Sequence, residues 1–180
     1  MKTPLHMILD LQHVSRWHMT GVLKQDNVAS HSFRVAVIAM AIAEDYQKTC
    51  DAPFGNLEMG VCYYAIKHDM EEAWTGDIPS DVKHAVESHV GTKVVNVVSG
   101  KKYVEEESDN CYINNIIKIA DTMDNYLYIK EFAMGDRSKS IVNELLYKYT
   151  TSMAKLKLFD EQLYESVHRV YCKIINREVK

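Results

Sequence analysis

Glycine and proline are scarce in this sequence. Its 180 residues contain seven Gly and three Pro. A β-sandwich needs a turn roughly every 8–12 residues, and such turns depend on these two residue types. The scarcity therefore disfavours an all-β fold and favours a helical one.

An excess of positive charge and a long apolar run are also missing. Lys and Arg total 21 against 25 Asp and Glu, which gives a net charge of −4. Proteins that bind a nucleic-acid polymer are usually basic, so no such partner is expected. No apolar stretch is long enough to span a bilayer, and residues 1–6 do not begin a signal peptide. These absences predict a cytoplasmic protein with no membrane partner.

The cysteines lack the spacing of a metal knuckle or a disulfide framework. No two of them form a CxxC pair. We expect all four to be buried free thiols in a reducing compartment. They are Cys50, Cys62, Cys111 and Cys172.

Apolar residues make up 47% of the chain, which is enough for one sizeable core. No linker or internal repeat divides the sequence, so we predict a single all-α domain over residues 1–180. The strongest helical signal covers residues 31–44, where nearly every side chain is apolar. A surface helix would have a polar face, so this helix is expected at the centre of a bundle.

Other helices are predicted on both sides of this segment. Pro4 after Thr3 predicts a first helix that reaches about Trp17, and Gly135 is placed to end a long helix as a left-handed cap. Residues 94–98 are β-branched and lie between glycines, so a strand, a loop or a helix is open. The remaining predicted helices cover residues 57–68, 81–90, 109–134, 141–149 and 161–176.

Four residues stand out as candidate metal ligands: His31, His68, Asp69 and Asp121. Imidazole and carboxylate groups suit divalent cations, and two of each leave coordination positions for water and a phosphate oxygen. Each residue alone also has an ordinary explanation. A histidine at a helix start is often a cap, a His-Asp pair occurs by chance, and Asp121 could lie on a solvated stripe.

The order of these residues resembles the HD-domain metal-dependent phosphohydrolases, which are helical bundles with this ligand set. The resemblance is greatest to the compact branch of YfbR-type 5'-deoxynucleotidases and phage DatZ-type dATP triphosphohydrolases. The motifs extend over about two thirds of the chain and are specific as a set. They are Arg16-Trp17, residues 27–32, His68-Asp69 with Glu72, residues 75–79, Lys83, and Lys118 with Asp121.

The resemblance implies a role for each of these residues. The four candidate ligands would hold one divalent ion, with Zn, Co or Mn expected, and Glu72 would be the catalytic acid or base. The phosphates would lie against basic side chains, and the nucleoside against a second group of residues. The expected phosphate contacts are Arg16, Lys83 and Lys118. The expected nucleoside contacts are Trp17 on the deoxyribose, Asp77 on the 3'-hydroxyl and Met19 on a purine.

The sequence therefore predicts a deoxynucleotide phosphohydrolase. A dATP triphosphohydrolase is favoured, which in a phage would empty the dATP pool in the host cytoplasm. A 5'-deoxynucleotidase that acts on deoxynucleoside monophosphates is the alternative, and a non-catalytic nucleotide-binding module is a more distant one. A homo-oligomer, dimer or hexamer, is also implied. Two departures from the family pattern, Ser30 and Asp81, lie near the mouth of the site and weaken inferences about the base.

Overall fold

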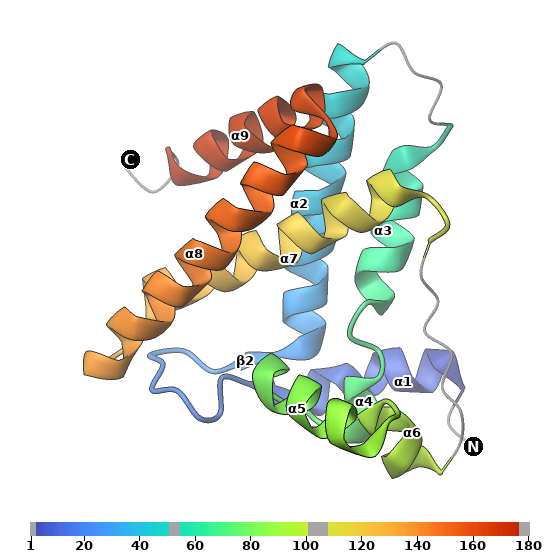
Figure 1. Cartoon of the computed structure of the whole chain (residues 1–180), viewed down its shortest axis with the longest axis vertical. Helices are drawn as coiled ribbons and strands as arrows, with labels where there is room; N and C mark the ends of the chain where they lie inside the picture. The colour runs from blue at the N-terminus through green and yellow to red at the C-terminus, as the bar shows by residue number, and fades with distance from the viewer. Residues whose placement is uncertain (1–2, 51–54, 101–107, 177–180) are drawn as a thin grey trace.

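Helix α2 (Val28–Thr49) forms the centre of the computed structural model, which describes residues 3–50, 55–100 and 108–176. Figure 1 shows α2 crossed by other helices along most of its length. Its side chains Val35, Ala39 and Ile42 are fully buried. Asn27 caps the helix by accepting a hydrogen bond from the Ser30 N–H at 2.8 Å. The prediction of a buried central helix is confirmed, and the helix extends past both predicted ends.

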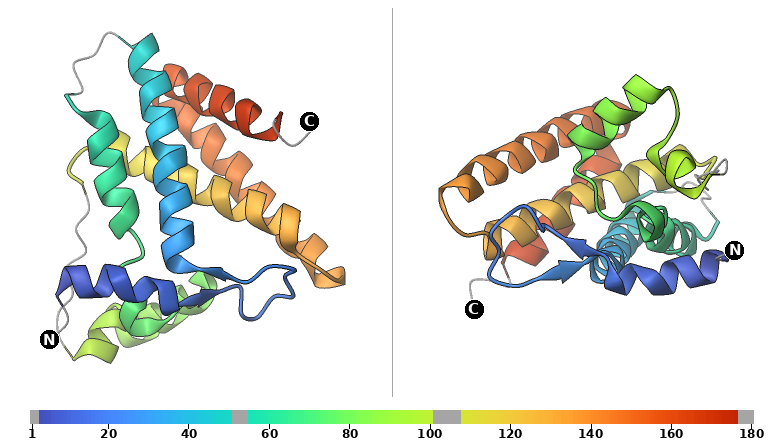
Figure 2. Two further views of the ribbon diagram at one scale, coloured as in Figure 1. Left: turned by 180° about the vertical axis from the view of Figure 1, so that it is seen from behind. Right: turned by 90° about the horizontal axis from the view of Figure 1, so that it is seen from below.

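Four further helices form the main core together with α2. They supply buried side chains such as Val61, Ile116, Met123 and Leu163. Helices α7 and α8 run side by side in Figure 1 and in the view from below in Figure 2. The four helices are α3 (Leu57–Lys67), α7 (Cys111–Phe132), α8 (Asp136–Phe159) and α9 (Glu161–Ile175).

Shorter elements gather at the end of the bundle where α2 begins (Figures 1 and 2). Strand β1 (Ser15–Arg16) pairs antiparallel with β2 (Asp26–Asn27) in a two-stranded ribbon that leads directly into α2. The short helices at this end are α1 (Pro4–Asp10), α4 (Glu72–Thr75), α5 (Ser80–Val90) and α6 (Val94–Ser99), with a 3₁₀ turn at Leu11–His13. The described part of the chain is otherwise helical, which confirms the all-α class.

The predicted extension of the first helix to Trp17 is wrong. The helix ends at Asp10 because the following residues form the 3₁₀ turn and then strand β1, which pairs with β2. Trp17 has φ of 60°, a conformation that a right-handed helix excludes. This pairing joins residues ten or more positions apart, and no local pattern indicates it.

The structure decides two other points. Residues 94–98 lie in helix α6, where Val94 and Val95 are buried and Gly100 provides a left-handed end with φ of 65°. The predicted left-handed cap at Gly135 is wrong. The long helix ends at Phe132, and Gly135 has φ of 82° and ψ of 176° just before α8. Helix α8 also begins earlier and ends later than the predicted 141–149 segment.

The four cysteines are free thiols, but the prediction that they are buried is wrong. Cys111 and Cys172 are exposed, and Cys50 and Cys62 are partly buried.

None of the helices described combines the length and hydropathy that a membrane crossing requires.

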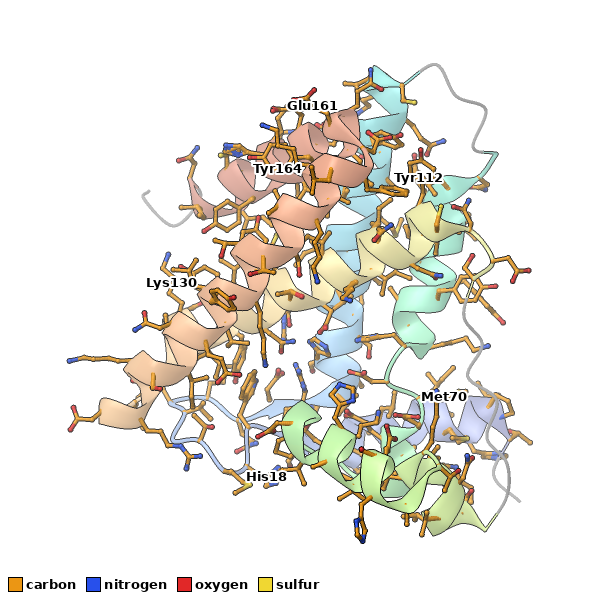
Figure 3. The ribbon with its side chains drawn as sticks, viewed as in Figure 1. His18, Met70, Tyr112, Lys130, Glu161 and Tyr164 are labelled. Carbon is orange, nitrogen blue, oxygen red and sulfur yellow. The ribbon has the colours of Figure 1, made fainter. Side chains whose placement is uncertain are left out.

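Asp160 ties α9 to the far end of the bundle. Its carboxylate accepts a hydrogen bond from the Leu163 N–H at 2.8 Å, which caps α9, and another from the buried Tyr46 hydroxyl at 2.7 Å. The Tyr112 hydroxyl lies 3.3 Å from the same carboxylate, and Figure 3 places Tyr112 at the end of the bundle where α9 begins. Burial acts to raise the pKa of Asp160, but these hydrogen bonds outweigh it and lower the pKa.

We expect Asp160→Ala to reduce the free energy of unfolding by about 2 kcal/mol at pH 7, because a helix cap and a buried hydrogen-bond acceptor are lost. Since the folded pKa is lowered, the contribution of Asp160 is present above its ordinary pKa of 3.8 and lost as the pH falls further. Urea titrations should show a smaller difference in the free energy of unfolding between variant and wild type at pH 3 than at pH 7. Glu165→Ala, at an exposed α9 position, is the control; equal losses in both variants would contradict the assignment.

Candidate metal centre and substrate cavity

His31 lies at the start of α2 and is completely buried. Its Nε2 atom is 3.1 Å from Asp121 Oδ1 on α7 and 3.5 Å from Asp69 Oδ2. The sequence puts His31 here because the Asn27 cap fixes where α2 begins, one turn earlier. A helix start and the middle of another helix thus bring an imidazole and two carboxylates together.

His68 and Asp69 complete this arrangement at the end of α3. His68 Nε2 is 3.2 Å from Asp69 Oδ2, and the rings of His31 and His68 have centroids 5.2 Å apart. One ligand atom from each of His31, His68 and Asp69 lies within 4.8 Å of the others, a spacing suited to a metal ion. These three residues and Asp121 are called the ligand cluster below.

The hydrogen bonds of the ligand cluster leave the Nε2 atoms of its two histidines available to bind a metal ion. His68 Nδ1 is 2.6 Å from the Ala65 carbonyl oxygen, so this nitrogen carries the proton and Nε2 has a free lone pair when the ring is neutral. The Nε2 atoms of His31 and His68 are both buried and face carboxylate oxygens at 3.1–3.5 Å, but neither makes a well-aligned hydrogen bond in the described residues. Buried polar atoms are rarely left unpaired. The donor set therefore fits a divalent cation.

The charges in the ligand cluster depend strongly on one another. Burial acts to lower the pKa of His68, but the Asp69 and Asp121 carboxylates outweigh it and raise the pKa to about 9. Burial acts to raise the pKa of Asp69, but the His68 and His31 rings outweigh burial and hold this pKa well below its usual range. A proton on His68 thus balances the acids, and a metal ion would take over that role by displacing the proton.

A buried carboxylate holds the other side of the His31 ring. Asp124 Oδ2 is 2.7 Å from His31 Nδ1, and Arg34 donates to both Asp124 oxygens at 2.7 and 3.0 Å. Arg34 also donates to both oxygens of Asp26 in strand β2, at 3.1 and 2.7 Å. Burial acts to raise the pKa of Asp124, but the hydrogen bonds from His31 and Arg34 lower it overall. The ionised Asp124 therefore fixes the orientation of the His31 ring and turns Nε2 toward the ligand cluster.

Asp121 is positioned by a second hydrogen-bond chain. Asn125, one turn further along α7, donates to Asp121 Oδ1 at 2.8 Å, and Arg16 donates to Asn125 Oδ1 at 2.7 Å. The stripe formed by Asp121 and Asn125 is thus part of the site rather than an ordinary solvated surface. Arg16 Nη1 is buried beside this chain with no hydrogen-bond partner in the part of the chain described.

A cavity of about 500 Å³ opens beside the ligand cluster. This volume is in the range of small-molecule sites, which is roughly 300–1,000 Å³. Most of the residues that the sequence singles out line it together, from the β1–β2 loop, the end of α3, the turn before α5 and helix α7. They are Arg16, Trp17, Met19, Asp69, Glu72, Asp77 and Asp121. His18 also lines it, and Figure 3 shows His18 at the end of the molecule where α5 lies.

Trp17 is held in the cavity wall by an unusual backbone conformation. Its φ of 60° is rare for a bulky residue, and its N–H donates to Asp77 Oδ2 at 3.3 Å. Strained conformations of this kind are kept where the surroundings fix them and often occur at functional sites. The contact links the β1–β2 loop to the turn before α5, so Trp17 and Asp77 are placed as a unit.

Glu72 has the electrostatics of a buried acid. Burial and the nearby Asp69 and Asp77 carboxylates raise its pKa to about 9. At neutral pH Glu72 therefore carries a proton, and its Oε2 is buried with no hydrogen-bond partner within the described residues. Such a carboxyl group can donate a proton to a leaving oxygen.

Two lysines with predicted phosphate contacts are not in the lining of this cavity. Lys83 pairs with Glu71, and Lys118 is exposed on α7. Neither is among the residues that line the cavity. Their neighbours Val82 and Asp121 do line it, and the contacts of the two lysines with substrate stay a prediction.

A family model for 5'-deoxynucleotidase YfbR-like proteins matches residues 4–167. The chain belongs to this family. A dATP triphosphohydrolase of Salmonella phage PMBT28 is 25% identical over 158 residues, which cover 83% of this chain and 79% of that protein. The 5'-deoxynucleotidase YfbR of Escherichia coli is 27% identical over 165 residues, or 82% and 78% of the two chains. The protein is accordingly a phosphohydrolase of the HD class.

Solved structures agree on the fold. The cyanophage S-2L HD phosphohydrolase (DatZ) superposes with a TM-score of 0.71 at 18% identity and covers 98% of both chains. The PH0347 protein of Pyrococcus horikoshii gives a TM-score of 0.60 at 22% identity, over 93% of this chain and 98% of that one. The HD-domain helical bundle expected from the motifs is confirmed.

Sequence reasoning missed the residues that support the ligand cluster. Asp124 and Arg34 carry no motif, although an Asp one turn after Asp121 in an apolar helix is a signal that could have been used. It also missed one wall of the cavity, which comes from α8. The residues of that wall are Arg137, Ile141, Glu144, Leu145 and Lys148.

We expect Asp124→Asn to weaken metal binding about 10–100-fold, because the amide replaces the charged partner that orients and polarises the His31 ring. Competition with a chromophoric chelator would measure the affinity, and circular dichroism would confirm that the variant folds. Asp109→Asn, at an exposed position before α7, should bind metal like the wild type. Wild-type affinity in a folded Asp124→Asn variant would show that this contact does not tune the metal.

Proposed function

We propose that the protein hydrolyses deoxynucleotides with one divalent metal ion, and that dATP is its main substrate. The products are triphosphate and deoxyadenosine. The observation that carries the proposal is a single cavity lined by Asp69 and Asp121 of the ligand cluster, by the buried acid Glu72, and by the linked pair Trp17 and Asp77. Metal ligands, a proton donor and the residues proposed to bind the nucleoside thus line one cavity.

The relatives support this substrate class. One is named as a phage dATP triphosphohydrolase, and the superposed cyanophage phosphohydrolase was solved with dA and one catalytic Zn²⁺ ion. A 5'-deoxynucleotidase is also among the relatives, so a deoxynucleoside monophosphate is the second candidate. Either reaction requires the same ligand cluster and the same acid.

The ligand cluster would hold the metal, for which we propose zinc, with cobalt or manganese as substitutes. When bound, a divalent ion acidifies a water molecule and polarises the phosphate under attack. His31 and His68 would hold it through their Nε2 atoms, and Asp69 and Asp121 through carboxylate oxygens. The mixed set suits a borderline cation better than a hard one such as magnesium.

The side chains of the site divide the remaining work. A water oxygen forms a bond to the α-phosphorus, and the bond from that phosphorus to the 5'-oxygen of the sugar breaks. Glu72, whose pKa is raised in the metal-free protein, would donate its proton to the departing 5'-oxygen. The proton that the attacking water loses passes to solvent, and solvent restores the acid form of Glu72. Arg16 Nη1 is buried, makes no hydrogen bond in the described residues and has only a 3.7 Å ion pair with Asp26, so it can bind an oxygen of the attacked phosphate.

We assign the nucleoside to the other residues of the cavity. Trp17 would pack on the deoxyribose and exclude a 2'-hydroxyl, and Asp77 would accept a hydrogen bond from the 3'-hydroxyl. Met19 is 62% exposed, so its flexible side chain is free to lie against a purine.

Product analysis tests the proposed function directly. Metal-loaded protein is incubated with dATP or dAMP, and the products are identified by mass spectrometry. We expect deoxyadenosine and triphosphate from dATP, and loss of the reaction when a chelator removes the metal. Phosphate release from dAMP with intact dATP would show the 5'-deoxynucleotidase instead. Metal binding without hydrolysis of either nucleotide would show a non-catalytic module.

Replacing Glu72 by glutamine separates catalysis from stability. We expect Glu72→Gln to lower kcat about 10²–10⁴-fold, since a proton donor is lost. The pKa of Glu72 is raised from its ordinary value of 4.5 to about 9 in the folded state. Its stabilising contribution is therefore full below pH about 4.5 and lost as the pH rises toward 9, whereas glutamine does not titrate.

Thermal unfolding of the metal-free proteins checks this second expectation. The unfolding temperature of Glu72→Gln relative to the wild type should rise between pH 5 and pH 9. A variant that is equally active, or one whose relative stability falls over this range, would remove Glu72 from the proposed role. Glu131→Gln on α7, at an exposed position outside the cavity, serves as the matched control.

A further inference from the structure

Helix α8 supplies a wall of the cavity that no motif of the sequence indicates. The residues of α8 that line the cavity are Arg137, Ile141, Glu144, Leu145 and Lys148. Their spacing of three and four positions places them on one face of the helix. Figure 1 shows the first half of α8 extending along α7 toward the β1–β2 loop. This face has a cation at each end and two apolar side chains between them.

The charge balance of the cavity makes these two cations important. Its lining residues include five acidic side chains besides the protonated Glu72, and three basic ones, which are Arg16, Arg137 and Lys148. Arg16 is the basic group assigned to the attacked phosphate, and it also donates to Asn125 and lies 3.7 Å from Asp26. A substrate with several negatively charged phosphates therefore meets repulsion wherever neither the metal nor a basic side chain compensates it. The cations of α8 are the lining groups that can provide that compensation.

Neither cation of α8 has a strong partner inside the fold. Lys148 pairs with Glu144 at 2.8 Å across one turn, and both side chains are about half exposed or more. Exposed pairs of this type contribute little to stability, so Lys148 can leave Glu144 for a phosphate at small cost. Arg137 is exposed and has no carboxylate partner among the residues described. Lys83, by comparison, is held by buried Glu71.

We propose that Arg137 and Lys148 bind the phosphates beyond the one that is attacked, and that they thereby select a triphosphate over a monophosphate. The inference rests on the proposed function and adds the substrate determinant that the metal ligands and Glu72 do not provide. These residues are specificity determinants, since the bond that breaks lies at the ligand cluster. Glu144 weakens the same site by competing for Lys148.

The test uses the reaction products as separate probes, which makes it independent of turnover. Binding of inorganic triphosphate and of deoxyadenosine to metal-loaded protein is measured by calorimetry at a fixed free metal concentration. We expect Lys148→Met and Arg137→Met each to weaken triphosphate binding about tenfold and to leave deoxyadenosine binding unchanged. Glu144→Gln should strengthen triphosphate binding. The KM for dATP should follow the triphosphate affinity in all three variants.

Matched controls lie on the same helix. Lys139→Met and Lys155→Met remove exposed α8 lysines that do not line the cavity, and both should bind triphosphate like the wild type. If triphosphate binding is weakened equally in the controls, the effect comes from the lower net positive charge of the protein rather than from a specific contact, and the inference is overturned. Weaker deoxyadenosine binding in Arg137→Met or Lys148→Met would assign this wall to the nucleoside instead and also overturn it.

The two proposals can fail separately. A protein that cleaves dAMP and leaves dATP intact contradicts the proposed substrate, whatever the α8 variants do. A protein that cleaves dATP, with unchanged triphosphate binding in both α8 variants, contradicts only the role of α8. Absence of triphosphate binding to the wild type also contradicts it.

Discussion

The buried Asp124 carboxylate connects the parts of the molecule on which the site depends. It accepts a hydrogen bond from His31 on α2 and two from Arg34, and it comes itself from α7. An ionised group in such a place is costly unless it is fully paired, and here its partners meet that condition. The same contacts hold two helices at one spacing and one histidine in one tautomer. Packing and metal chemistry therefore depend on one carboxylate.

Arg34 extends this dependence to the substrate side of the site. It pairs with Asp26 of strand β2, and Asp26 also lies 3.7 Å from Arg16 Nη1 across the ribbon. The ribbon in turn positions Trp17 at the cavity. A displacement of α7 relative to α2 would therefore disturb the ligand cluster and the substrate wall together. This coupling links the ribbon, which directly precedes α2 in the sequence, to α7 as well.

The helices were largely predictable because their signals are local. The apolar run after His31 and the spacing of apolar residues before Gly135 each identify a helix without knowledge of its neighbours. The ribbon was missed because its pairing joins Ser15–Arg16 to Asp26–Asn27 across a loop. Gly135 was assigned the wrong conformation because a positive φ alone does not distinguish a left-handed cap from an extended connection.

The site residues also fall into those with a local sequence signal and those without one. His31, His68-Asp69 and Asp121 stand in motifs that a sequence can reveal, whereas Asp124 looks like any polar residue one turn further along the helix. Helix α8 was predicted in part, but its amphipathic pattern does not specify which cavity its polar positions face. Residues that hold a ligand can be recognised by their chemistry. Residues that orient them are recognised only by where the fold places them.

Unpaired polar atoms define the limits of the site better than any single motif. Seven side-chain atoms in the described residues are buried without a hydrogen-bond partner, and five of them belong to the ligand cluster or the cavity lining: Arg16 Nη1, Trp17 Nε1, His31 Nε2, His68 Nε2 and Glu72 Oε2. Each unpaired atom destabilises the free protein. A metal ion and an anionic nucleotide would satisfy the two histidines and the arginine at the same time. The buried polar atoms that lack a hydrogen bond thus lie where bound ligands would supply one. Almost all other buried side-chain polar atoms in the described residues have a hydrogen-bond partner.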